Sequence, residues 1–395
     1  MTTPRPLVVL ASGVSWDDPW MSEKHLAVAL APYVPVLFVD PPVSVLTPLR
    51  KRHLRGGALR PRLTSPHPGI TRVTPVAPPG VSRPGLRVLA AAATRSAIRH
   101  AVRRTTDRPH ALVVASLDDV LGSLPDVRRV LWGTDDWVAG AELMGLSPAY
   151  LRRREDAQLG AADLVVTVTR HLADRWRDRC REVVVVPNGC DPGHFARTDD
   201  TPTDTSIALP PPVAGFVGRL SDRIDLDLLT AVADTGTSLL LVGPVDPSFA
   251  TDRFAALVAR ENVQAVGPQP FSALPGLLRL VDVGLTPYAD TDFNRASFPL
   301  KTLEYLAAGL PVVSTALPAT DDLPADLVTT AAGPQEFARA TLDELARADD
   351  LGRADRSARS RAYAREQDWD ARARDFLGVL GLAWLSAERP RAASR

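Results

Sequence analysis

The sequence predicts an α/β protein of two domains, each built around a parallel sheet. The chain has 395 residues, more than a single continuous core usually serves. Short apolar runs alternate with helical patterns along most of the chain, which is typical of parallel strands joined by helical crossovers. A segment rich in Thr, Asp and Pro, residues 196–212, separates two such series and indicates a linker.

The first half contains short runs rich in Val, Leu and Ile, as expected for strands that are buried on both faces. We expect strands at 7–11, 34–40, 70–75, 111–116, 129–132, 164–169 and 183–187. Helical patterns predict helices at 23–30, 86–104, 148–161 and 171–177.

The second half repeats the same alternation. Strands are expected at 213–217, 238–242, 263–266, 283–287, 311–314 and 327–330, and helices at 225–234, 249–260, 271–280, 300–308, 335–348, 352–367 and 370–385. We therefore expect an N-terminal domain at 1–197, a linker at 198–212 and a second domain at 213–370. Residues 371–395 are expected to form a helix that packs back toward the first domain, followed by a disordered tail.

Composition excludes several classes of protein. Hydrophobic residues make up 45% and charged residues 23%, which excludes disordered and collagen-like chains. The two cysteines, Cys180 and Cys190, have no histidine cluster beside them, so neither a disulfide framework nor a zinc site is expected. No apolar run approaches the roughly 18 residues of a membrane span, and the N-terminal residues lack the pattern of a signal peptide. A cytoplasmic protein is the expectation.

The charge is distributed unevenly along the chain. Residues 41–106 contain 13 Lys and Arg, including Arg50, Lys51 and Arg52, and no acidic residue. Clustered cations attract anions, so we expect this stretch to contact the acceptor or an anionic membrane surface. The alternative is a solvated basic face, since the chain uses 43 Arg and only 3 Lys. Pro, Gly and Arg dominate 41–84, which favours a mobile loop there, and the lack of aromatic residues argues against nucleic acid.

Two segments of the second half carry possible ligand chemistry. In PVAGFVGRLSDRIDLD, residues 212–227, an apolar strand precedes Gly218, Arg219 and Arg223, which suits an anion such as a diphosphate. The alternative is an ordinary turn whose arginines pair with nearby aspartates. In FPLKTLEYLAAGLPVVST, residues 298–315, Lys301 and Glu304 lie one turn apart on a helix that ends at Gly309. At the mouth of a cleft, Lys301 could bind a phosphate and Glu304 could accept hydrogen bonds from paired hydroxyls. The alternative is an exposed ion pair between the two side chains.

Taken in order, these segments resemble a known family. PNGCDPGHF, GFVGRLSDRIDLDLL, LLLVGP, VQAVGPQPFSALPGLLRLVDVGLTPY and PLKTLEYLAAGLPVVST are similar to the nucleotide-sugar domain of GT-B glycosyltransferases of the family 4 type. WDDPWMSEKHLAVALAPYVPVLFVDPP and LWGTDDWVAG are similar to a bacterial subgroup related to teichuronic acid biosynthesis. The resemblance covers about residues 6–385. It implies two Rossmann-like domains facing each other across a cleft, and an enzyme that transfers a sugar from a nucleotide-sugar.

The resemblance also implies roles for individual residues. Gly218 and Arg219 match the family's Gly-Arg at the diphosphate, with Arg223 near its basic partner, and Glu304 matches the glutamate that binds the ribose hydroxyls. Loops around the base are expected at Gly243, Gln269 and Phe271, and the first loop of the N-terminal domain at Gly13. The donor, activated by UDP, GDP or dTDP, is a co-substrate, so no cofactor and no metal are expected. The Asp290-Thr291-Asp292 pattern is the weaker alternative of a metal site.

The sequence departs from the family pattern at two places. Ala296 stands eight residues before Glu304, where many members have another glutamate, so Ser297, Asn294 or backbone N–H groups near Phe298 are expected to contact the sugar. Ile224 replaces a basic residue, so Arg223 or Lys301 is expected to complete the diphosphate clamp.

The N-terminal domain also departs from the family, because Gly133-Thr134-Asp135-Asp136 replaces the usual His-Asp pair. The resemblance implies a retaining reaction in which the departing phosphate helps deprotonate the acceptor. An inverting reaction would instead need a general base, for which Asp17, His25 and Asp135 are the candidates. Alternative functions are a nucleotide-sugar 2-epimerase and a catalytically silent binding protein. The acceptor is expected to be a cell-envelope glycan intermediate or a secondary metabolite.

Overall fold

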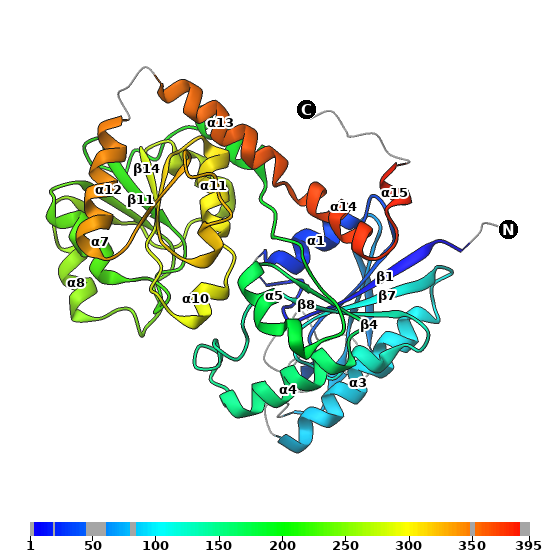
Figure 1. Ribbon diagram of the computed structural model, residues 1–395. Coiled ribbons are helices and arrows are strands. Elements are labelled where there is room, and N and C mark those ends of the chain that lie inside the picture. Colours follow the sequence, from blue (N-terminus) through cyan, green and yellow to red (C-terminus); the bar gives the residue numbers. More distant parts are fainter. Residues whose placement is uncertain (1–3, 19, 45–60, 80–83, 348–351, 388–395) are drawn as a thin grey trace. The chain divides into compact units, whose positions relative to one another are not determined.

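The computed structural model describes residues 4–18, 20–44, 61–79, 84–347 and 352–387 (Figure 1). The chain divides into two compact units. Unit 1 comprises Met1–Pro187 and Trp369–Arg395, and unit 2 comprises Asn188–Asp368. Each unit contains one large sheet, which confirms the predicted α/β class. No helix within the described ranges is long and apolar enough to cross a membrane.

Unit 1 is built on an eight-stranded sheet in the order β10-β9-β8-β7-β1-β2-β5-β4. Its neighbouring strands are parallel except for β4 and β5. The central strands are almost wholly buried because their residues are apolar on both faces. The strands are β1 (Pro6–Ser12), β2 (Val36–Val39), β4 (Arg62–His67), β5 (Ile70–Thr74), β7 (Arg108–Ala115), β8 (Arg128–Gly133), β9 (Leu164–Thr167) and β10 (Val183–Val185), with a small pair β3 (Val43–Ser44) and β6 (Val76–Ala77).

The helices of unit 1 connect these strands and include the C-terminal helices of the chain. They are α1 (Ser22–Leu30), α3 (Pro84–Val102), α4 (Pro148–Ala161), α5 (Arg170–Trp176), α14 (Trp369–Val379) and α15 (Trp384–Ala387). Helices α1 and α14 lie side by side (Figure 1). The Phe376 ring of α14 meets the Trp132 ring of β8 edge to face, and His110 Nε2 lies 2.8 Å from the Leu380 carbonyl oxygen. The final residues of the chain, 388–395, for which we expect a disordered tail, lie outside the described ranges.

The expectation of a mobile loop over 41–84 is wrong for its second part. Strand β4 pairs antiparallel with β5 through a turn at Gly69, whose φ is +78°. The sequence of β4, RLTSPH, has no alternation of apolar and polar residues, so no strand was expected there. None of its side chains is buried. Arg50, Lys51 and Arg52 lie outside the described residues.

Unit 2 contains a six-stranded parallel sheet in the order β13-β12-β11-β14-β15-β16. Each strand lies within one residue of its predicted range. The strands are β11 (Val213–Val217), β12 (Ser238–Val242), β13 (Val263–Ala265), β14 (Val283–Thr286), β15 (Val312–Thr315) and β16 (Val328–Ala331).

Helices cover both faces of this sheet, giving three layers (Figure 1). Alternate residues of β11 point to opposite faces, so Phe216 joins one core and Val217 the other. The first core is shared with α7 (Leu226–Asp234), α8 (Asp252–Val258) and α12 (Pro334–Ala346). The second is shared with α6 (Pro192–Phe195), α9 (Leu274–Leu278), α11 (Leu300–Ala308) and α13 (Arg353–Glu366), and α10 (Asp292–Ala296) is a short additional helix.

The division between the units differs from the expected boundary at 197. Unit 2 begins at Asn188 because the segment after β10 packs into the second core of unit 2. Cys190 and Phe195 are buried in that core, and the Cys190 N–H donates to the Gln367 carbonyl at 2.9 Å. Part of the expected linker is also helical, since residues Ala196–Asp199 form a 3-10 turn.

Candidate functional site

Gly218 and Gly243 pack closely against each other at the carboxyl edge of the unit 2 sheet, where β11 and β12 end; we call this contact the glycine crossing. The Gly218 N–H donates to the Val242 carbonyl at 2.8 Å, and the Gly243 N–H donates to the Gly267 carbonyl at 2.9 Å. Gly243 has φ +143°, and a Cβ on it would lie 1.8 Å from the Gly218 carbonyl oxygen. Only glycine fits at position 243, and this close approach lies at the edge where ligands of open α/β sheets bind.

Arg219 follows this crossing and is tied to the next loop. Its guanidinium forms an ion pair with Asp246 at 2.5 Å, and 64% of the Arg219 side chain is exposed. The alternative partners expected from the sequence are not used, since Asp225 caps α7 and Asp227 pairs with Arg253. Because the pair is largely exposed, its net stabilisation is small, and Arg219 can leave Asp246 for a stronger anion at little cost.

Arg223 is held by a neutral set of neighbours. Its guanidinium carbon lies 4.9 Å from the centre of the Phe293 ring and 5.6 Å from that of Tyr288. Its Nε donates to Asn294 Oδ1 at 3.0 Å. Among the described residues, neither of its Nη groups has an acceptor. Within the described part of the chain, Arg223 therefore has two free donor groups.

Lys301 and Glu304 form a largely buried pair on the first turns of α11. Lys301 Nζ lies 2.7 Å from Glu304 Oε2, and only 27% and 9% of the two side chains are exposed. The exposed ion pair considered from the sequence is therefore not what forms. Burial lowers the pKa of Lys301, but the adjacent Glu304 carboxylate more than offsets this and the net pKa is raised. Helix α11 ends at Gly309 in the left-handed conformation, which confirms that sequence prediction.

Tyr288 connects these charged groups. Burial raises the pKa of its phenol, Arg223 and Lys301 act in the opposite direction, and Glu304 reinforces the increase. Charges from both segments thus act on one phenol, and the Arg223 guanidinium carbon lies 5.6 Å from the centre of its ring. Sequence reasoning did not single out Tyr288, because its environment depends on contacts between the loop after β14 and segments distant along the chain.

The segment before α11 carries the residues expected to replace the missing glutamate. Ala296 is fully buried, and the Ser297 hydroxyl donates to the Phe293 carbonyl at 2.9 Å. Asn294 is 2% exposed and its amide group bonds to neighbouring backbone, so it is not available to a sugar. Phe298 is partly buried against the second core of unit 2.

Gln269 and Phe271 occupy the loop after β13. The Gln269 amide donates to the Val266 carbonyl at 3.1 Å. The Phe271 ring stacks on His194 with ring centres 3.9 Å apart, and 46% of the residue is exposed. His194 Nε2 also lies 2.9 Å from the Phe271 carbonyl oxygen. The loop is therefore fixed by His194, which the sequence did not single out.

In unit 1, the loop after β1 is fixed to β2 and β5. A Cβ on Gly13 would lie 2.9 Å from the Ala115 carbonyl oxygen at the end of β7. Asp17 forms an ion pair with Arg72 at 2.7 Å, and Arg72 also contacts the buried Asp40 at 2.7 Å. The Asp40 carboxylate accepts the N–H of Trp16 at 2.9 Å. Asp17 thus anchors the loop, and both of its oxygens face Arg72.

His25 lies between two aromatic rings. Its imidazole stacks on Trp369 of α14 with an interplanar angle of 3° and ring centres 5.1 Å apart. The Trp20 ring is tilted by 53° to the imidazole, with ring centres 4.8 Å apart. The imidazole orientation is therefore set by packing against α14, whose first residue lies far along the chain from His25.

Asp135, in the loop after β8, lies near a carboxyl group that the sequence interpretation missed. Glu23 is 5% exposed in the first turn of α1. The pKa of Glu23 is raised to about 7, chiefly by burial; the Glu23 backbone N–H opposes this rise and the charge of Asp135 adds to it. A signal was present, because Glu23 shares the spacing of the buried residues Leu26, Ala27 and Leu30 on one helix face.

Asp290 and Asp292 are each engaged within the segment that forms α10. Both Asp290 oxygens accept from Arg295, at 2.6 and 2.8 Å, and this contact lowers the pKa of Asp290. Thr291 caps α10, and Asp292 lies in its first turn. Within the described ranges, no three His, Cys, Asp or Glu side chains are grouped as metal ligands.

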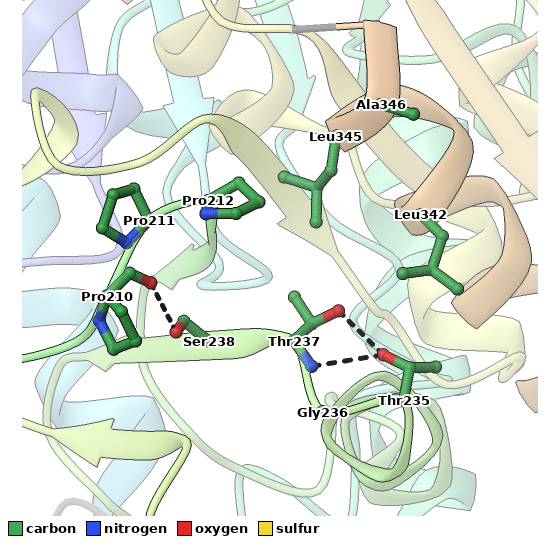
Figure 2. Close-up of a pocket in the computed structure, with 10 residues that line it drawn as sticks. All are labelled: Pro210, Pro211, Pro212, Thr235, Gly236, Thr237, Ser238, Leu342, Leu345 and Ala346. Atoms are coloured by element: carbon green, nitrogen blue, oxygen red, sulfur yellow. Dashed lines mark hydrogen bonds between the residues drawn. The ribbon is translucent and has the colours of Figure 1, made fainter.

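A shallow depression of about 430 Å³ lies at the other edge of the unit 2 sheet (Figure 2). It is found at the amino ends of β11 and β12, opposite the glycine crossing, and the Ser238 hydroxyl there donates to the Pro210 carbonyl at 2.6 Å. It has no charged side chain, so it suits a diphosphate poorly. Its lining consists of Pro210, Pro211, Pro212, Thr235, Gly236, Thr237, Ser238, Leu342, Leu345 and Ala346.

Part of the chain is similar to known glycosyltransferases. Residues 211–347 match the model of the glycosyl transferases group 1 family, and this range includes the glycine crossing, Arg223 and the Lys301–Glu304 pair. The Bacillus subtilis teichuronic acid biosynthesis glycosyltransferase TuaH is 36% identical over 113 residues. That match spans 28% of this chain and 28% of the relative.

Solved structures resemble the chain over nearly its whole length. Sucrose-phosphate synthase from Thermosynechococcus elongatus matches with a TM-score of 0.72 and 18% identity, covering 97% of this chain and all of the other. The chain has the GT-B fold. Anabaena HepE, solved in complex with UDP and glucose, matches this fold with a TM-score of 0.66 and 16% identity over 95% of this chain and 99% of its own. These matches confirm the predicted resemblance to GT-B glycosyltransferases.

Proposed function

We propose that the protein is a glycosyltransferase whose unit 2 binds a nucleotide-sugar donor. The observations that carry the proposal are the Lys301–Glu304 pair on α11 and Arg223 beside the Tyr288 ring, all within the segment that matches the group 1 glycosyl transferases. Cations beside a carboxylate at the carboxyl edge of a parallel sheet suit the diphosphate and ribose of such a donor. The complex of HepE with UDP and glucose makes UDP the first nucleotide to test.

The proposed chemistry rests on charge stabilisation. A departing nucleoside diphosphate gains negative charge as the sugar becomes cationic, and fixed cations lower the energy of that state. Arg223 and Lys301 would supply this charge, together with Arg219 once it leaves Asp246. The N-terminal amides of α11 would add to it, since that helix has no side-chain cap. Glu304 would accept hydrogen bonds from the ribose.

We further propose a reaction without a metal and with retention of configuration. Both are what the resemblance implies: Arg219, Arg223 and Lys301 would stabilise the leaving group in place of a metal, and the departing phosphate would accept the acceptor's proton. Should the reaction invert instead, the base would come from unit 1. There the Glu23 carboxyl beside Asp135 is better suited than Asp17, because Asp17 is paired with Arg72.

We propose that the acceptor is a cell-envelope glycan intermediate and that unit 1 contacts the inner face of an anionic membrane. Support comes from the name of the Bacillus subtilis relative and from α3, which lies in the stretch without acidic residues. Val88 and Leu89 on α3 are 65% and 50% exposed. Exposed apolar side chains among cations suit an anionic lipid surface.

Vesicle sedimentation tests this contact. Val88→Ser with Leu89→Ser should reduce binding to phosphatidylglycerol vesicles at low salt, whereas Leu342→Ser in unit 2, also an exposed leucine, should not. If the Val88→Ser, Leu89→Ser double variant binds the vesicles as strongly as the Leu342→Ser control, the membrane proposal is contradicted.

The donor proposal is tested by thermal unfolding in the presence of UDP, GDP, dTDP, ADP and CDP and their common sugar conjugates. A ligand that binds the folded state raises its unfolding temperature. We expect one nucleoside diphosphate to stabilise the protein more than the others. Release of epimerised sugar without an acceptor would point to a 2-epimerase, and no stabilisation by any nucleotide would contradict the donor assignment.

A further inference from the structure

Asn294 bridges the two segments that meet at Arg223. Its side-chain amide donates to the Arg223 carbonyl at 2.9 Å and to the Ala289 carbonyl at 2.8 Å. Its Oδ1 accepts from Arg223 Nε at 3.0 Å. The Asn294 N–H donates to the Thr291 hydroxyl at 3.2 Å, which fixes the start of α10. One buried side chain therefore holds both the backbone and the guanidinium of Arg223.

These contacts use both N–H groups of the Asn294 amide, and the residue is 2% exposed. An arginine on a surface loop normally samples many rotamers, and ordering it on a ligand costs free energy. Here the Nε contact and the Phe293 and Tyr288 rings fix the guanidinium plane before any ligand arrives. A neutral amide achieves this without cancelling the positive charge, as an aspartate would.

We propose that Asn294 is a positioning residue that orients Arg223 toward the diphosphate of the donor. This inference rests on the proposed donor site. The residue acts through Arg223 and does not contact the sugar. In this chain the segment that has Ala296 in place of a glutamate thus contributes to diphosphate binding through the arginine it holds.

A double-mutant cycle tests the proposal. Binding of UDP and of uridine is measured by titration calorimetry for the parent, Arg223→Ala, Asn294→Ala and the double variant; the nucleoside diphosphate that stabilises the protein most replaces UDP if it differs. We expect Arg223→Ala and Asn294→Ala each to weaken diphosphate binding by about tenfold or more, with less than a twofold change for uridine. On the Arg223→Ala background, Asn294→Ala should add almost nothing.

Two further variants separate positioning from a merely structural role. Asn262→Ala is the matched control, because the Asn262 amide also bridges two carbonyls, of Ala233 and Thr237, away from Arg223. It should leave UDP affinity unchanged. Asn294→Asp is nearly isosteric but places a carboxylate on Arg223, so it should lose at least as much UDP affinity as Asn294→Ala.

The outcomes are distinguishable. Additive losses in the cycle, equal losses for uridine, or a milder effect of Asn294→Asp than of Asn294→Ala would each overturn the positioning role while leaving the donor site in place. If Arg223→Ala binds UDP as tightly as the parent, the diphosphate assignment of Arg223 is itself wrong, and the role of Asn294 fails with it.

Discussion

Replacing Glu23 by Gln should change how the stability of unit 1 depends on pH. The folded state holds the Glu23 proton up to about pH 7, whereas the unfolded chain releases it near pH 4.5. Between these values the folded state binds more protons, so its stability falls as the pH rises. Each pH unit in this window costs about 1.4 kcal/mol, for a total of about 3 kcal/mol. Gln keeps the size of the side chain and removes this cost.

Tryptophan fluorescence isolates the effect, because all seven tryptophans of the chain lie in unit 1. Urea unfolding of the parent and of Glu23→Gln is followed by this signal from pH 4.5 to 8. We expect the variant to gain stability relative to the parent as the pH rises, reaching up to about 3 kcal/mol above pH 7. Glu142→Gln, the same substitution at an exposed glutamate of unit 1, is the matched control. Parallel pH profiles for Glu23→Gln and the parent would refute the assignment of a buried, protonated carboxyl.

Three further predictions concern the donor site. Glu304→Gln should weaken binding of the ribose-containing nucleotide by about 10- to 100-fold, since a charge-assisted bond is lost, and unchanged affinity in calorimetry would exclude a ribose contact. Gly243→Ala should abolish nucleotide binding and lower the unfolding temperature, because its Cβ would overlap the Gly218 carbonyl; normal binding would mean that the crossing can open freely. Asp246→Asn should strengthen diphosphate binding by up to about fivefold by releasing Arg219 from a surface pair, and weaker binding would show that Asp246 itself supports the ligand.

Most strands of both sheets could be predicted because each buried strand is a contiguous run of apolar residues. The runs at β11 and β12 are apolar on both faces, as parallel strands between two helical layers must be. Strand β4 could not be found this way, since it lies at a sheet edge, none of its side chains is buried, and its sequence has no apolar alternation. Local periodicity identifies buried elements and fails at exposed edges.

In the candidate site, contacts within one helix could be predicted from the sequence and contacts between distant segments could not. Lys301 and Glu304 lie one turn apart, so their pairing follows from helix geometry. The partner of Arg219 could not be inferred, because Asp246 comes from the loop after another strand and nearer aspartates were available. The role of Asn294 depends on two loops meeting in space. His25 likewise stacks on a helix from the far end of the chain. Such contacts are set by topology, which local sequence does not encode.

The location of the bound nucleotide decides whether the carboxyl edge of the unit 2 sheet is the donor site. Hydrogen–deuterium exchange is measured with and without the nucleoside diphosphate that stabilises the protein most. We expect slower exchange at residues 218–224 and 298–304, at the carboxyl edge of the unit 2 sheet. Protection confined to residues 235–238 and 342–346, around the depression at the opposite edge (Figure 2), would contradict it.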